Sequence, residues 1–158
     1  MCCRNSLRGE PMKVDEINIA IIKHMRDGRK SFKKIADELS LTVNTVKARV
    51  NKLRKEGVLD IAGLVNPAAI PGHTVIFLCV KLKTMNLVKK GEEFGRLKGV
   101  VSVSVVTGRF DLIVMALLNN EFSLLEFFTE EVSKIDGVSS TETFVVYQSR
   151  NLKVPYTL

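Results

Sequence analysis

The stretch from Thr42 to Gly57 constrains the fold of this sequence most, because its apolar residues repeat at the spacing of an α-helix. Thr42 can cap the start of such a helix and Gly57 can end it. The apolar residues that share one side are Val43, Val46, Val50 and Leu53. The opposite side carries no acidic residue before Glu56. The segment therefore predicts a helix that packs on one side and presents polar and cationic groups on the other.

Two shorter helices are expected before this one. Val14–Arg26 has apolar residues close to a 3.6-residue period, and Asp27-Gly28 can stop it. A second helix is expected over residues 31–39, and only Ser40-Leu41 separates it from the third. Three helices with a tight turn between the last two predict a helix-turn-helix domain over residues 12–57.

The outer side of the third predicted helix suits the reading of DNA. Short polar side chains near its start can reach base edges in the major groove, and long cations can neutralise phosphates. An ordinary solvated helix is the alternative, but it would usually carry glutamates that pair with lysines one turn away. The expected DNA contacts are Ser31, Thr42, Asn44, Thr45, Lys47, Ala48, Arg49, Asn51, Lys52 and Arg54.

The distribution of charge agrees with a polyanionic partner for the first part. The formal net charge is +7. Residues 1–60 hold 14 basic and 8 acidic residues, whereas residues 61–158 hold 10 and 9. A solvated basic surface would produce the same imbalance, so charge supports double-stranded DNA as a partner without deciding it.

The second part of the chain predicts alternating strands and helices. Asn66-Pro67 and Pro71-Gly72 break the chain, so residues 58–72 are expected to form a β-leaning hinge. The segments that follow read as strand, helix, strand, strand, helix and strand: His73–Lys83, Asn86–Leu97, Val100–Thr107, Asp111–Leu118, a helix from Ser123 to Gly137, and Ser140–Tyr147. This is the βαββαβ order of a ferredoxin-like domain, here over residues 73–150. The predicted fold class is α+β, with an N-terminal three-helix, winged-type helix-turn-helix domain.

Other features limit what the chain can be. The strands barely alternate, which suggests that both faces of the sheet are covered and favours an oligomer. No apolar run approaches the roughly 20 residues of a membrane span, and the opening residues lack a signal peptide, so a cytoplasmic protein is expected. The three cysteines form no framework or Cys-x-x-Cys pair, and neither a metal site nor a cofactor is expected. Residues 1–11 are expected to be a disordered leader and residues 151–158 a C-terminal tail.

The motifs of both parts together resemble the Lrp/AsnC, or feast/famine, transcription regulators. In the first part these are Asp15, Ile21-Ile22, residues 27–31, Ile35-Ala36, Leu39, Thr42-Val43, Thr45-Val46, Arg49-Val50, Leu53 and residues 56–59. In the second part they are residues 100–103, residues 106–112, Gly137-Val138 and Thr141–Val146. Two positions depart from the family pattern: Asn18 replaces a frequent Asp, and Ser40 replaces a frequent Gly.

The resemblance implies a homodimer that assembles to a tetramer or octamer and binds an amino-acid effector where dimers meet. The effector would lie against the hairpin of residues 107–111, where Gly108 permits close approach and Asp111 can hold an ammonium group. A well-made β-turn, with Gly for geometry and Asp for a local hydrogen bond, is the alternative. The effector contacts expected are Thr107, Gly108, Arg109, Asp111, Ser139, Ser140 and Thr141.

Two other functions compete with a regulator. Some tetrapyrrole decarboxylases share this two-part architecture. Such an enzyme should gather His and Arg around a pocket in the second part, but the only histidine there is His73. A module that binds only proteins should show an apolar stripe on the outer side of the third helix, and none is present. The prediction is therefore a sequence-specific DNA-binding regulator without catalytic residues.

Overall fold

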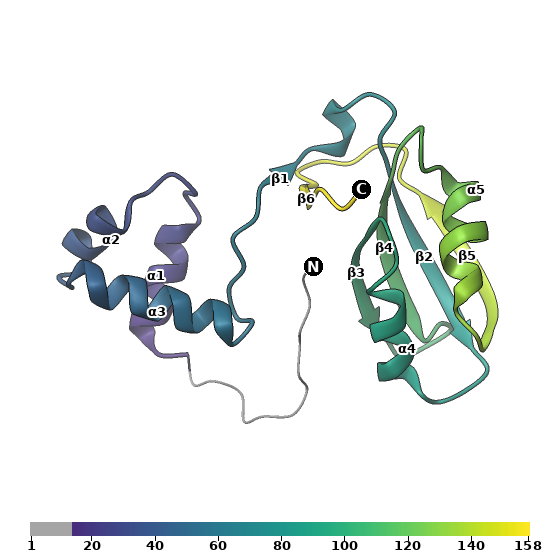
Figure 1. Ribbon diagram of the computed structural model, residues 1–158, viewed down its shortest axis with the longest axis horizontal. Helices are drawn as coiled ribbons and strands as arrows, with labels where there is room; N and C mark the ends of the chain where they lie inside the picture. The colour runs from purple at the N-terminus through teal and green to yellow at the C-terminus, as the bar shows by residue number, and fades with distance from the viewer. Residues whose placement is uncertain (1–13) are drawn as a thin grey trace. The chain divides into compact units, whose positions relative to one another are not determined.

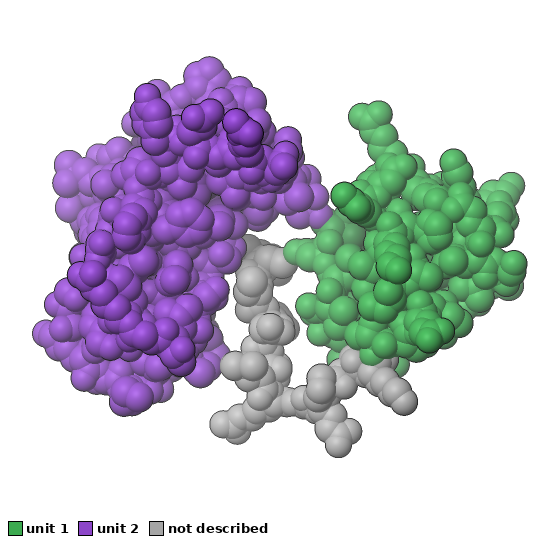
Figure 2. Space-filling view, turned by 180° about the vertical axis from the view of Figure 1, so that it is seen from behind, with its two compact units in different colours: residues 1–61 green, residues 62–158 purple. Residues whose placement is uncertain are grey.

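The computed structural model of the chain describes residues 14–158, so the leader predicted at residues 1–11 lies outside it. The chain divides into two compact units: unit 1 ends at Ile61, and unit 2 is Ala62–Leu158 (Figure 2). The boundary falls inside the hinge predicted at residues 58–72. Among the described residues, no helix has both the length and the hydropathy that crossing a membrane requires.

Unit 1 is built from three helices, α1 (Glu16–Met25), α2 (Phe32–Glu38) and α3 (Val43–Lys55) (Figure 1). The side chains of Asp15, Ser31 and Thr42 each cap one helix by accepting a hydrogen bond from a backbone N–H. Between residues 14 and 61 the structure contains no strand, so the winged form suggested by the sequence is not seen there. The buried core of the unit is Ile21, Ile35, Ala36, Val46 and Val50.

Helices α2 and α3 end in the same hydrogen-bonded turn. After α2, the N–H of Leu41 donates to the carbonyl of Ala36 over 2.9 Å, which is the wide bond of a Schellman motif. The residue inside this turn must be left-handed, and Ser40 has φ +53°. After α3 the same position is Gly57, with φ +69°. Ser40 therefore occupies a position that favours glycine, as its departure from the family pattern suggested.

Unit 2 confirms the ferredoxin-like plan. Its main sheet has the order β3-β4-β2-β5 with every neighbouring pair antiparallel. Helix α4 and the α5 segment pack on the same face of this sheet (Figure 1). The core between them contains Leu78, Phe94, Val114 and Phe127. The elements are β2 (Thr74–Leu82), α4 (Leu87–Phe94), β3 (Val100–Val105), β4 (Leu112–Leu118), α5 (Leu124–Glu126) and β5 (Val138–Val145).

The helix predicted from Ser123 to Gly137 is not uniform. Only α5 is α-helical, and it continues as a π-helical turn (Phe127–Glu131) and a 3-10 turn (Val132–Lys134). The hydroxyl of Thr129 donates to the carbonyl of Leu125, and the hydroxyl of Ser133 donates to the carbonyl of Thr129. Such bonds to carbonyls one turn back share acceptors with the backbone ladder and weaken a regular α-helix, and they lie where the helix type changes.

The predicted C-terminal tail folds back onto unit 2. Within the β-leaning hinge predicted over residues 58–72, the one strand is β1 (Leu64–Val65). It pairs antiparallel with β6 (Val154–Pro155), and a 3-10 turn, Pro67–Ala69, follows it. Val154 is buried against Val75 and Leu117. Sequence analysis did not predict this pairing, because the two strands lie far apart along the chain.

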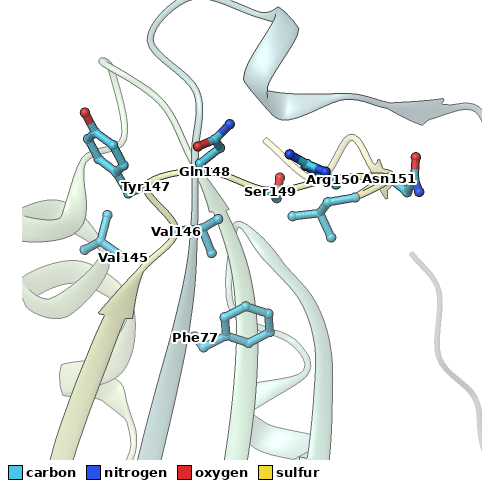
Figure 3. A pocket seen from close by; sticks show the side chains of 9 residues that line it. Phe77, Val145, Val146, Tyr147, Gln148, Ser149, Arg150 and Asn151 are labelled. Atoms are coloured by element: carbon cyan, nitrogen blue, oxygen red, sulfur yellow. The ribbon is translucent and has the colours of Figure 1, made fainter.

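The sheet face opposite the helices, called the open face below, is covered at one end only. Strand alternation places Phe77 and its partner Phe144 on this face, and Phe144 is 51% exposed. A shallow hollow of about 770 Å³ lies over it, lined by Phe77 and by residues 145–152 (Figure 3). The apolar strands predicted cover on both faces of the sheet. In the single chain, most of the open face has no such cover.

Candidate functional site

The outer side of α3 is a polar and cationic surface on a firmly packed helix. Val46, Val50 and Leu53 are at most 1% exposed, so the buried side of α3 is locked against unit 1. The helix contains no acidic residue, and its last turn carries Lys52, Arg54 and Lys55. All the predicted DNA contacts are exposed except Thr45 and Arg49, which are half-buried. This arrangement presents a rigid row of donors and positive charges to an anionic partner.

The hydroxyls among the predicted contacts already serve as caps. Ser31 Oγ accepts from the N–H of Lys34 and Thr42 Oγ1 from the N–H of Thr45, both over 3.2 Å. The hydroxyls of Thr42 and Thr45 also lie 2.9 Å apart. A capping hydroxyl accepts one hydrogen bond and keeps its own hydrogen, but the Thr42–Thr45 contact uses the hydrogen of one of these two threonines. Ser31 and one of the two threonines can therefore donate to phosphate oxygens.

Arg49 differs from the other predicted contacts because its guanidinium is bound within unit 1. Its Nη1 donates to Asp15 Oδ2 over 2.7 Å and to Asn18 Oδ1 over 2.9 Å. The hydrogen bond from Arg49 and the N–H of Asn18 hold the pKa of Asp15 below its ordinary value. Asn18 is 7% exposed and is the one buried polar residue in the described chain.

Sequence reasoning missed this cluster, although a signal for it was present. Asp15, Asn18 and Ile21 are spaced three apart, and Asn18 and Ile21 are the two buried residues of α1. A polar residue in the buried stripe of a helix needs a hydrogen-bonding partner, and Arg49 on α3 supplies it.

The hairpin predicted to bind an effector is held by its own unit. Asp111 Oδ2 accepts from the N–H of Leu82 over 2.8 Å, and Oδ1 accepts from Lys81 Nζ over 2.9 Å. These two bonds, the first above all, lower the pKa of Asp111. Asp111 thus makes the local bonds that a structural turn requires. Lys81, which binds Asp111, was not among the residues that the sequence indicated for this site.

The structure brings the two segments of the predicted effector site to one end of the sheet. Lys81 pairs with Ser140 on β5 while its side chain reaches Asp111. Arg109, with a side chain 80% exposed, lies 3.3 Å from Glu142 of the same strand. Thr107, Ser139 and Thr141 are also exposed.

The backbone at the tip of this hairpin is open. Gly108 has φ +128°, and no atom of the described chain beyond its neighbours lies within 4 Å of where a Cβ would stand. A ligand or another chain can therefore approach this backbone closely.

Comparison with known proteins assigns a family to each unit. Residues 14–54 match the AsnC-type helix-turn-helix domain, and residues 75–153 match the Lrp/AsnC ligand binding domain. An uncharacterised HTH-type transcriptional regulator of Pyrococcus horikoshii is 34% identical over 137 residues, which cover 85% of this chain and 87% of the relative.

Solved structures share the fold. Escherichia coli AsnC has a TM-score of 0.66 at 20% identity, and the match covers 88% of this chain and 95% of AsnC. A Neisseria meningitidis transcriptional regulator, solved as an L-Met complex, has a TM-score of 0.65 at 18% identity, with 91% and 95% covered. These identities extend the likeness to the fold alone.

Proposed function

Because the chain belongs to the Lrp/AsnC family of transcription regulators, we propose that it reads its operator through α3 and responds to an amino acid bound at unit 2. The family makes it a DNA-binding regulator and not an enzyme, with the helix-turn-helix in unit 1 and the ligand-binding domain in unit 2. A regulator of this kind works where the DNA is, and we place it in the cytoplasm.

The observation that supports the reading surface is the outer side of α3. Asn44 and Asn51 have side chains that suit adenine edges, and Ala48 between them suits a thymine methyl. Lys47, Lys52 and Arg54 are assigned to phosphates, and the caps Ser31 and Thr42, with Thr45, to phosphates at the helix start. Arg49, the remaining predicted contact, bonds Asp15 and Asn18 in this structure.

A salt titration tests this assignment. The probe is a duplex selected from a random-sequence pool by the unaltered chain, and its affinity is measured by fluorescence anisotropy at several KCl concentrations. Each phosphate contact adds about 0.9 to the slope of log K against log salt, so Lys47→Ala with Lys52→Ala should flatten it by about two. Lys83→Ala with Lys153→Ala, exposed lysines of unit 2, is the control and should leave the slope unchanged. Binding that does not depend on salt would contradict the proposal.

The open face is the proposed dimer contact. Phe144 is half exposed on it beside Phe77, and a sheet needs cover on both faces to bury such residues. Two reading helices related by a twofold axis would then match half-sites about one helical turn, or roughly 34 Å, apart. Dimers are proposed to join into tetramers or octamers. Light scattering after gel filtration gives the assembly mass, and Phe144→Asp should reduce it to that of a monomer.

The hairpin of residues 107–111 and the start of β5 are the proposed effector site. The exposed groups there are Gly108, Thr107, Arg109 and the hydroxyls of residues 139–141. Asp111 remains an acceptor, because a carboxylate offers about four lone-pair sites and only two are used here. The L-Met complex of the Neisseria regulator supports an amino acid as the ligand class. A neighbouring dimer is proposed to close the site.

A further inference from the structure

We infer that Arg49 is a positioning residue, which fixes α3 against α1 through Asp15 and Asn18 instead of contacting a DNA phosphate. The inference rests on the proposed reading of DNA by α3. It concerns how that helix is held, and so it assigns a function to the one predicted contact that points away from the others.

The position of Arg49 on α3 agrees with this role. At 100° per residue, Arg49 lies about 60° from the buried Val46, whereas Ala48 and Lys55 lie about 160° and 180° from it. The flank that carries Arg49 faces α1, since its Nη1 reaches the N-cap and a first-turn residue of that helix. The side chain is 30% exposed, compared with 47% for Asp15.

Release of Arg49 to a phosphate would be costly. The guanidinium would lose a charge-assisted bond to Asp15 and the bond to Asn18. Asn18 is buried, so its amide oxygen would be left without a partner. In addition, Asp15 already balances the charge of Arg49, so the pair adds no net charge to the attraction of DNA.

The bonds of Arg49 add a directional tie to the apolar packing that holds α3. Burial of Val46 and Val50 sets which side of α3 faces the core, but the hydrophobic effect itself has no direction. A guanidinium nitrogen that bonds two acceptors has a fixed direction, and it ties the middle of α3 to the start of α1. Asn51 follows Arg49 by two residues, so a rotation of α3 would misdirect it in the groove.

A pair of charge-matched variants separates positioning from phosphate contact. Asp15→Asn keeps the helix cap, because Asn caps as well as Asp, but places an amide donor against the guanidinium. Glu16→Gln removes the same charge one residue away and touches no bond of Arg49. If Arg49 serves a phosphate, Asp15→Asn frees it and strengthens binding. If Arg49 positions α3, Asp15→Asn weakens binding to the selected duplex about tenfold while Glu16→Gln does not.

The measurement uses the full chain at 25 °C, with folding verified by circular dichroism. We expect Asp15→Asn and Arg49→Met to lower the preference for the selected duplex over a scrambled one, without a change in salt slope. Their double variant should be no weaker than Arg49→Met alone. A loss of stability without a change in this preference would overturn the inference, and so would a slope that falls by about one in Arg49→Met.

This outcome is distinct from failure of the proposed reading surface. If Lys47→Ala with Lys52→Ala leaves the slope unchanged, α3 is not the DNA-contacting helix and the inference fails with its premise. If that slope flattens while Asp15→Asn binds as tightly as Glu16→Gln, only the role of Arg49 is overturned.

Discussion

The carboxylate of Asp111 lies 2.8 Å from the backbone nitrogen of Leu82, which joins the start of β4 to the last residue of β2. Lys81, the residue before Leu82, binds the other carboxylate oxygen. The hairpin offered to an effector is thus fastened to the end of a central strand. A ligand that moves this hairpin would also act on β2.

The bonds of Asp111 should make the stability of the protein depend on pH. Its pKa is lowered in the folded chain, so its contribution is present above the unfolded pKa and is lost as the pH falls through the folded value. Asp111→Asn should therefore lower Tm at pH 7, and the difference from the unaltered chain should shrink below about pH 4. Calorimetry between pH 3 and 7 measures this difference. The exposed Asp136→Asn is the control, and a difference that stays constant with pH would contradict the expectation.

The turn after α2 offers a stabilising substitution. A non-glycine residue in the left-handed region costs about 1–2 kcal/mol of strain. Glycine avoids this strain, but it loses more conformational entropy on folding, which offsets part of the gain. Ser40→Gly should therefore raise the free energy of unfolding by about 1 kcal/mol. Gly57→Ser, in the matching turn after α3, should lower it by a similar amount. Urea unfolding followed at 222 nm compares the two, and equal signs for both changes would contradict the argument.

An amino acid that binds unit 2 should raise Tm. A ligand present at 100 times its Kd stabilises the folded state by about 2.7 kcal/mol. A thermal-shift screen with each standard amino acid at millimolar concentration should reveal one or a few that act. Thr107→Val should abolish the shift, whereas Thr84→Val, at an exposed threonine outside the hairpin, should retain it. A flat screen would reject the amino-acid effector and leave DNA binding unaffected.

The strand β6 should contribute measurably to unit 2. Val154 is 2% exposed, and Val154→Ala removes about two buried methylene equivalents from a packed site. The expected loss is about 2 kcal/mol in the free energy of unfolding. The neighbouring Lys153 is exposed, so Lys153→Ala should have little effect. Chemical denaturation monitored by circular dichroism distinguishes the two variants.

Local signals in the sequence predicted most of the fold. Thr42 was expected to cap the third helix, and it does so in the structure. The first two helices begin close to their predicted starts, at the caps Asp15 and Ser31. The strand order could be expected because the βαββαβ succession matches few topologies. The family pattern has Gly where Ser40 stands, and the structure gives Ser40 the left-handed backbone that favours Gly.

Pairings between distant residues could not be read from the sequence. The partner of Arg49 lies 34 residues earlier, so the helical projection alone placed this cation with the DNA contacts. Leu64 of β1 finds its partner at Pro155, and a strand of two residues has no periodicity to detect. The π-helical turn after α5 lies where the Thr129 and Ser133 hydroxyls bond carbonyls one turn back, and helical spacing does not reveal such bonds.

The pairing of β1 with β6 also sets an order of events during synthesis. Chains emerge from the ribosome at about 5–20 residues per second, and domains tend to fold as they appear. Every contact within unit 1 can form once residue 61 has been made, whereas Leu64 must wait until Pro155 has been made. Contacts of such long range form slowly. The nascent chain can therefore complete its DNA-binding head while the strand that opens the sensing unit is still unpaired.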